Sequence, residues 1–195
     1  IPAFLGEVDV LKAIQLLPGV QSSEGSTGFY VRGGGPDQNL ILMDGVPVYN
    51  ASHIGGLFSV FNADAINNVR LTKGGFPARF GGRLSSVLQI DMKEGNMKEF
   101  KADVSLGLIS SKITIEGPIV KDKTSFIFSG RRTYADLIAR TFIPSEETYA
   151  LYFYDFNAKI NHKISDSDRI FLSTYSGRDI ISIEDNGVRS SKQDT

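Results

Sequence analysis

The sequence has no cysteine, no tryptophan and only two histidines among its 195 residues. Without cysteine it can form neither disulfide bonds nor thiolate metal sites. It also lacks any apolar run approaching the ~20 residues that a membrane-spanning helix needs. That last absence does not exclude a membrane protein, because the strands of a membrane barrel alternate between apolar and polar residues.

The chain also lacks an excess of charge. Its net charge is −1, and its lysines and arginines are spread along the whole length, so nucleic-acid binding is not expected. Catalytic signatures are missing too: there is no GxSxG elbow or Ser-His-Asp set, and Asp37 and Asp44 lie in turn contexts. The sequence therefore predicts a protein that is not an enzyme. Its 41% hydrophobic content supports a buried core.

The first half predicts a short helix followed by short strands. Val10, Leu11, Ile14 and Leu17 recur at helical spacing within Glu7–Leu17, and Pro18-Gly19 then ends the helix. Strand-like runs follow at Phe29–Val31, Asn39–Met43, Val69–Thr72 and Ser86–Met92. Between them, Leu57–Phe61 and Asn62–Asn68 predict helical turns, with Asn62 as an N-cap. A small mixed sheet with short helices is the expected assembly.

Glycine clusters mark the turns of this first half. Gly33-Gly34-Gly35 could in principle cradle a phosphate group, since glycine backbones can present several N–H groups to an anion. No Lys-Ser/Thr pair follows it, and the GxGxxG spacing is absent, so a turn is the favoured interpretation. Gly74-Gly75 and Gly81-Gly82 flank a tight aromatic loop in the same way.

From Lys101 onward the chain alternates between apolar and polar residues. In the clearest run, Tyr152 to Ile164, one face carries Tyr154, Phe156 and Ile160, and the other carries polar side chains such as Asp155 and Asn157. A period of two residues with one apolar and one polar face is typical of β-strands. Residues 96–195 are therefore predicted to form about five strands.

Two architectures fit these strands. The turns Val120–Thr124 and Ser165–Asp168 are short, whereas Thr141–Ala150 and Ile181–Thr195 are longer, and membrane barrels alternate short turns with long loops in this way. A soluble β-sandwich alternates as well, so periodicity leaves both open. Five strands with open edges cannot stay in lipid, where only closed barrels satisfy the backbone. If the strands belong to a barrel, we expect the chain to be a fragment of a longer exported precursor.

Four motifs in the first 95 residues point to one family. They are LLPGV at Leu16–Val20, YVRGGG at Tyr30–Gly35, LILMDGVPV at Leu40–Val48, and the glycine-rich segment Ile66–Gly95. In this order and spacing they resemble the TonB-dependent outer-membrane receptors in the style found in Bacteroidetes. The resemblance implies an α+β plug domain (a small mixed sheet with short helices) in residues 1–95. Antiparallel β-strands of an incomplete transmembrane β-barrel would follow in residues 96–195.

The same resemblance implies roles for particular residues. The loops at the outward apex of the plug meet substrate in this family, and the matching candidates here are Asp37, Gln38, Tyr49, Asn50 and His53. Plug–barrel latch candidates are Arg32, Arg79, Arg83 and Glu116. A metal role is not expected for His53, which has no second histidine or carboxylate at ligand spacing. No cofactor is expected either.

The implied function is energised import across the outer membrane of a Gram-negative bacterium. In this family a barrel of about 22 strands encloses the plug. A TonB-type protein in the periplasm pulls a segment that would lie before Ile1. Outer-membrane lipid is a further expected partner. A surface lipoprotein or a larger envelope complex is a possible one. The alternative is a structural or accessory barrel subunit without transport. Siderophore, oligosaccharide, peptide and cobalamin-like cargo all remain open.

Overall fold

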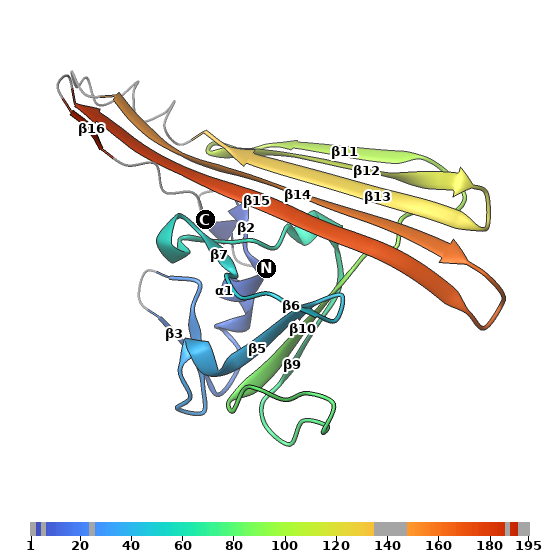
Figure 1. Cartoon of the computed structure of the whole chain (residues 1–195), viewed down its shortest axis with the longest axis horizontal. Helices are drawn as coiled ribbons and strands as arrows, with labels where there is room; N and C mark the ends of the chain where they lie inside the picture. Colours follow the sequence, from blue (N-terminus) through green and yellow to red (C-terminus); the bar gives the residue numbers. More distant parts are fainter. Residues whose placement is uncertain (1–2, 5–6, 24–25, 135–147, 186–187, 191–195) are drawn as a thin grey trace. The chain divides into compact units, whose positions relative to one another are not determined.

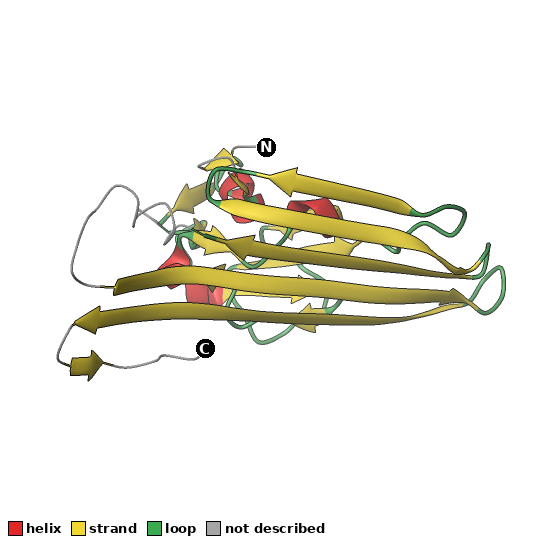
Figure 2. Cartoon of the chain, turned by 90° about the horizontal axis from the view of Figure 1, so that it is seen from above, coloured by secondary structure: helices red, strands yellow, loops and turns green. Residues whose placement is uncertain are grey.

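The computed structural model describes residues 3–4, 7–23, 26–134, 148–185 and 188–190. Within these residues the chain is mostly strand with a few short helices (Figures 1 and 2). It divides into two compact units, the first formed by residues 1–4 and 8–93 and the second by residues 5–7 and 94–195. Among the described residues, no helix has the length and apolar character required to span a membrane.

The N-terminal part of the chain contains many short elements around one small sheet. They are β1 (Ala3–Phe4), β2 (Glu7–Val8), α1 (Val10–Ile14), β3 (Val20–Ser22), β4 (Phe29–Val31), η1 (Pro36–Gln38), β5 (Asn39–Met43), β6 (Val46–Pro47), β7 (Ser52–His53), η2 (Ile54–Gly56), β8 (Phe58–Ser59), η3 (Ala63–Ala65), β9 (Ile66–Thr72) and β10 (Ser86–Met92). The main sheet has the order β6-β5-β10-β9, with β10 parallel to β5 and antiparallel to β9. This confirms the predicted mixed sheet.

Strand β10 forms the centre of that sheet. Val87, Leu88 and Ile90 are buried, and Leu88 has no exposed surface. Consecutive side chains of a strand point to opposite faces, so the burial of both Val87 and Leu88 means that β10 is covered on both faces, which explains its nearly continuous hydrophobic sequence. A polar link also lies inside: Ser86 Oγ donates to Asn39 Oδ1 at 2.7 Å, and Asn39 Nδ2 donates to the carbonyl oxygen of Phe29 at 2.8 Å. The buried polar atoms on β10 and β5 are thereby paired.

The first helix is shorter than the sequence predicts. Helix α1 covers only Val10–Ile14, because Asp9 is its N-cap and accepts hydrogen bonds from the amides of Leu11 (2.8 Å) and Lys12 (3.2 Å). The second carboxylate oxygen of Asp9 accepts from the amide of Ser59 at 2.8 Å. The prediction of a helix over Glu7–Leu17 is therefore wrong at both ends, and Glu7 lies in strand β2 instead.

The segment between β7 and β9 contains a second correction. Leu57–Phe61 is not a helical turn, because Phe58–Ser59 forms strand β8 and pairs with β7. The turn after Asn62 is confirmed in shorter form as η3, and Asn62 caps it by accepting a hydrogen bond from the amide of Asp64 at 3.1 Å. From Ile66 the chain is already in strand β9, three residues before the predicted start at Val69.

The hairpin between β5 and β6 explains the Asp-Gly pair of the LILMDGVPV motif. Met43 pairs with Val46, so the loop has two residues, and both have positive φ, 49° at Asp44 and 84° at Gly45. Such a type I′ turn matches the twist of the strands and favours Asn or Asp followed by glycine. The Asp44 side chain also accepts a hydrogen bond from the Met92 amide at 3.0 Å, which ties the turn to β10.

The second unit contains one sheet of six antiparallel strands. They are β11 (Lys101–Leu106), β12 (Ser110–Val120), β13 (Thr124–Thr133), β14 (Thr148–Lys163), β15 (Arg169–Asp185) and β16 (Val188–Ser190), each paired with the next in chain order (Figure 1). The short turns at 120–124 and 165–168 are confirmed. The predicted loop at 181–195 begins too early, because β15 continues to Asp185. Of the predicted loop at 141–150, residues 141–147 lie outside the described residues and 148–150 already belong to β14.

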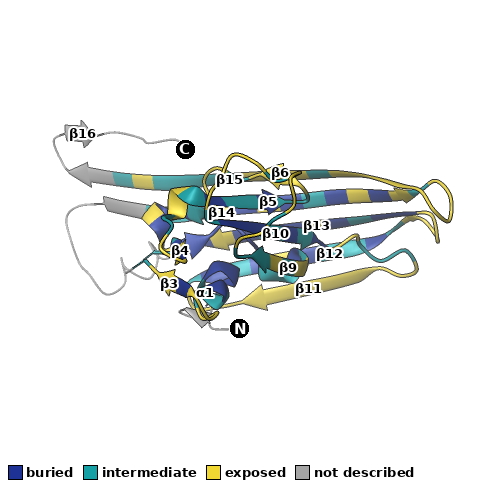
Figure 3. Ribbon diagram, turned by 90° about the horizontal axis from the view of Figure 1, so that it is seen from below, coloured by how far each residue is buried: buried dark blue, intermediate teal, exposed yellow. Residues whose placement is uncertain are grey.

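This sheet buries polar side chains on one face and exposes apolar side chains on the other, which is the reverse of a soluble sheet. On β14, Asp155, Asn157, Lys159 and Asn161 are buried, whereas Tyr154, Phe156 and Ile160 are exposed. Figure 3 shows the alternation of buried and exposed positions along β13 and β14. A soluble sheet buries its apolar face in a core, so polar-in and apolar-out alternation is the pattern of a membrane barrel wall. The structure therefore resembles part of a barrel, and the predicted fold class is confirmed.

The segment that leads into this sheet is tied to its strands. The Glu94 carboxylate accepts hydrogen bonds from Arg169 Nη1 at 2.8 Å and Asn161 Nδ2 at 3.2 Å, and its carbonyl oxygen accepts from Ser125 Oγ at 2.6 Å. Gly95 follows with a φ of +79° and lies directly against the backbone of Phe126. Residues 94 and 95 thus contact β13, β14 and β15 through both backbone and side chains.

Candidate functional site

Three of the predicted substrate-binding residues line one hollow in the first unit. The hollow has a volume of about 300 Å³ and is lined by Leu11, Ser26, Thr27, Gly28, Phe29, Pro36, Asp37, Ile41, Tyr49, Asn50, Ala51 and Ser52. Asp37 comes from η1, while Tyr49 and Asn50 come from the loop between β6 and β7. The fold therefore brings together two loops that the sequence analysis had named separately.

The hollow combines apolar and polar side chains. Phe29, Leu11 and Ile41 supply apolar surface, and Asp37, Asn50 and Tyr49 supply polar groups. The Asn50 side-chain oxygen accepts from the Ser52 amide at 3.3 Å, which fixes the loop, and Tyr49 is 89% exposed. An exposed aromatic ring beside a carboxylate and an amide can stack on a ligand and hydrogen-bond it, as in many small-molecule sites.

The other two predicted substrate residues lie elsewhere. Gln38 ends η1, and its carbonyl oxygen accepts a hydrogen bond from the Ser85 amide at 3.0 Å. His53 is 4% exposed in strand β7, which pairs with β8. Neither residue lines the hollow. Among the described residues, no group of three or more His, Cys, Asp or Glu could hold a metal ion.

Two of the four latch candidates, Arg79 and Arg83, contact a neighbouring residue in the chain. The Arg79 guanidinium lies 4.7 Å from the centre of the Phe80 ring, and Arg83 donates to the carbonyl oxygen of Gly82 at 3.1 Å. Arg32 has a positive φ of 50° in the turn between Val31 and Gly34. Glu116 lies on β12, on the same face as Lys112 and Thr114. These contacts do not test a plug–barrel latch, which stays a prediction.

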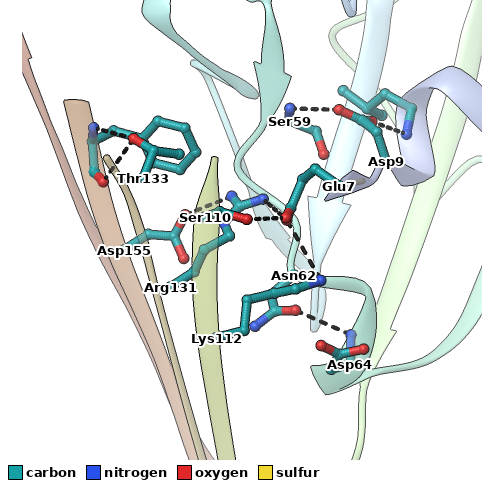
Figure 4. Close-up of polar contacts among 12 residues, drawn as sticks. Glu7, Asp9, Ser59, Asn62, Asp64, Ser110, Lys112, Arg131, Thr133 and Asp155 are labelled. Carbon is teal, nitrogen blue, oxygen red and sulfur yellow. Dashed lines mark hydrogen bonds and ion pairs between the residues drawn. The ribbon is translucent and has the colours of Figure 1, made fainter. Parts of the chain in front are cut away.

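A buried ionic cluster in the second unit was missed by the sequence analysis. Arg131 on β13 donates from Nε (3.0 Å) and Nη2 (2.5 Å) to Asp155 Oδ2 on β14. Its Nη1 donates to Glu7 Oε1 at 3.0 Å, and Lys112 Nζ lies 3.6 Å from the same oxygen. All four side chains are buried (Figure 4). Alternation predicts which face each strand residue occupies, but no signal in the sequence links Glu7 to strands more than 100 residues away.

Comparison with known proteins gives a profile match to part of the chain and similar solved structures. The sequence profile of the TonB-dependent receptor plug domain matches residues 4–86. The sequence matches none of the curated proteins with which it was compared. The structure is similar to two crystal structures, the siderophore receptor PirA from Acinetobacter baumannii (20% identity, TM-score 0.61) and PirA from Pseudomonas aeruginosa (18% identity, TM-score 0.60).

The structural matches cover most of this chain but a minor part of each receptor. They cover 89% and 90% of this chain, but only 29% and 34% of the two receptors. The chain thus spans about a third of the length of each. At such identities the likeness shows the fold alone, and the profile match concerns residues 4–86.

Proposed function

We propose that residues 4–86, which match the profile of the TonB-dependent receptor plug domain, are the plug of an outer-membrane receptor of a Gram-negative bacterium, and that the chain gates energised import. Residues 1–95 serve as the plug, and residues 96–195 serve as the first strands of the surrounding barrel. A TonB-type protein in the periplasm supplies the energy by pulling a segment N-terminal to the plug. The family consists of receptors and transporters rather than enzymes.

The observation that supports this proposal best is the inverted polarity of the second unit. Phe156 and Ile160 on β14 are exposed beside Phe128 on β13, while Asp155 and Asn157 are buried. Apolar side chains directed outward fit acyl chains, and polar side chains directed inward fit the lumen of a barrel that holds a plug. Strands β12 to β15 are 10–17 residues long. A tilted strand needs about 9–11 residues to cross a bilayer, so all four are long enough.

The barrel can be tested by the gel mobility of the full-length protein. An antibody against residues 1–95 is used to detect the protein in isolated outer membranes, with and without boiling. We expect a band far larger than the 21.3 kDa of this chain that migrates faster before boiling than after it. A soluble species near that mass with unchanged mobility would contradict the barrel.

The hollow at Asp37, Tyr49 and Asn50 is our proposed cargo contact. The two similar structures are siderophore receptors, so ⁵⁵Fe-loaded catecholate and hydroxamate siderophores are the first probes to test. Uptake by cells carrying the full-length protein should depend on TonB. In the Tyr49→Ala variant, the concentration for half-maximal uptake should rise about tenfold, from loss of about 1–1.5 kcal/mol of stacking.

Tyr30→Ala is the matched control for that experiment. Tyr30 is a partly exposed tyrosine on β4 that does not line the hollow, so its loss should leave uptake unchanged. Equal effects of the two substitutions would contradict the assigned contact. Cargo binding without TonB-dependent uptake would instead support the alternative function, an accessory barrel subunit of a larger envelope complex.

A further inference from the structure

The Glu7 carboxylate lies in a group of three hydrogen-bond donors on two neighbouring strands. Ser110 Oγ donates to Glu7 Oε2 at 2.5 Å, Arg131 Nη1 donates to Oε1 at 3.0 Å, and Lys112 Nζ lies 3.6 Å from Oε1 (Figure 4). Both oxygens of the carboxylate are therefore bound. All of these residues belong to the second unit.

The strands alone bring the three donors together. Lys112 on β12 is the register partner of Arg131 on β13, and Ser110 lies two residues before Lys112 on the same face. Two cations directly opposite each other on adjacent strands repel, and here both are buried. An anion between them removes this repulsion, so the sheet is built to receive one at this position.

With Glu7, the formal charges of the four buried side chains of the cluster sum to zero. Arg131 is paired with Asp155 at 2.5 Å, which compensates one of the two buried cations. The wall residues Lys112, Arg131 and Asp155 together carry one positive charge, and the Glu7 carboxylate neutralises it. Removal of one member of a buried ionic cluster is strongly destabilising, so loss of the Glu7 carboxylate is expected to be costly here.

We propose that Ser110, Lys112 and Arg131 form a carboxylate-binding site on the polar face of the barrel wall, and that Glu7 is its intramolecular occupant. Glu7 comes from a two-residue strand, β2, and reaches the site with its side chain. The Glu7 carboxylate therefore occupies the site as a bound ligand would. When that side chain is removed, a small free carboxylate takes its place. This inference rests on the proposed barrel but not on import or on the identity of the cargo.

The test is chemical rescue of Glu7→Ala in the full-length protein. Alanine removes the carboxylate and leaves room beside the three donors. We expect the melting temperature to fall by at least about 5 °C, because two buried cations then lose a carboxylate that both contact. Sodium formate should restore at least half of that loss with a saturable dose dependence, whereas sodium chloride at equal ionic strength should not.

Two further variants separate the site from a general salt effect. Glu99 lies 3.3 Å from Lys101 at the surface, so Glu99→Ala also removes a carboxylate from a lysine but should neither lower the melting temperature nor respond to formate. In Glu7→Gln the amide fills the space, so formate should have no effect. Equal stabilisation of all variants by formate, or an unchanged melting temperature in Glu7→Ala, would overturn the proposal.

A refolding assay keeps the test decisive if Glu7→Ala does not assemble. The yield of heat-modifiable protein is then compared after refolding in formate and in chloride. The site predicts that formate raises the yield of Glu7→Ala at least about threefold, the change expected when a ligand at a few times its Kd favours the folded state. The yield of Glu7→Gln should stay the same in both salts. An equal response of the two variants would refute the carboxylate site.

Discussion

Replacement of Arg131 with methionine should lower the free energy of unfolding by about 3–5 kcal/mol, the usual cost of removing one member of a buried ionic cluster. Arg131 is 3% exposed, and its guanidinium donates to both Asp155 and Glu7. Methionine fills similar space but leaves two buried carboxylates with Lys112 as the remaining cation of the cluster. The loss can be measured as a lower urea midpoint of the heat-modifiable form.

Arg132→Met is the control for this prediction. Arg132 is the next residue on β13, is exposed, and lies with its guanidinium 5.2 Å from the centre of the Tyr152 ring. An exposed cation–π contact contributes about 0.5–1 kcal/mol, so this variant should be much less affected. Arg131→Lys should be intermediate, because one ammonium group keeps the charge but cannot reproduce the geometry of the guanidinium. Similar midpoints for Arg131→Met and Arg132→Met would show that the cluster does not stabilise the fold.

Gly95→Ala should reduce the amount of assembled protein severely. A Cβ atom at this position would lie 2.3 Å from the carbonyl oxygen of Phe126, and β13 cannot move away because it is paired on both sides. The φ of +79° adds a further penalty for any residue with a side chain. Together these effects are expected to cost about 2–5 kcal/mol. The measurement is the fraction of heat-modifiable protein in the outer membrane.

Gly82→Ala separates the two causes. Gly82 has nearly the same φ, +82°, but a Cβ atom there would meet no atom within 4 Å. This variant therefore carries the backbone penalty without the clash and should lose about 1–2 kcal/mol. If both variants assemble to the same extent, the contact between Gly95 and β13 is not required for folding.

Local patterns in the sequence were sufficient to predict most helices and strands but not the residues at which they begin and end. Apolar spacing predicted a helix over Glu7–Leu17, but Asp9 accepts hydrogen bonds from the amides that follow it and sets the start at Val10. The strand at Phe58–Ser59 was missed for a related reason. It exists through pairing with Ser52–His53, and such pairing between two-residue strands has no periodicity to detect.

The candidate hollow was predictable only in part. The resemblance supplied Asp37, Tyr49 and Asn50, and the fold places them around one volume. It could not show that Gln38 and His53, which come from the same loops, lie outside that volume. Neighbouring residues in a turn point in different directions, and the backbone angles of that turn decide which of them reach a site.

The sequence by itself determined the mixed sheet and the alternation of the later strands, because each depends on residues close together in the chain. The tertiary structure alone decided that Glu7 binds Ser110, Lys112 and Arg131, 103 to 124 residues away. It also decided that Gly95 lies against Phe126. Such contacts depend on strand register and on the approach of distant segments. Both are set by the packing of the whole unit rather than by any local pattern.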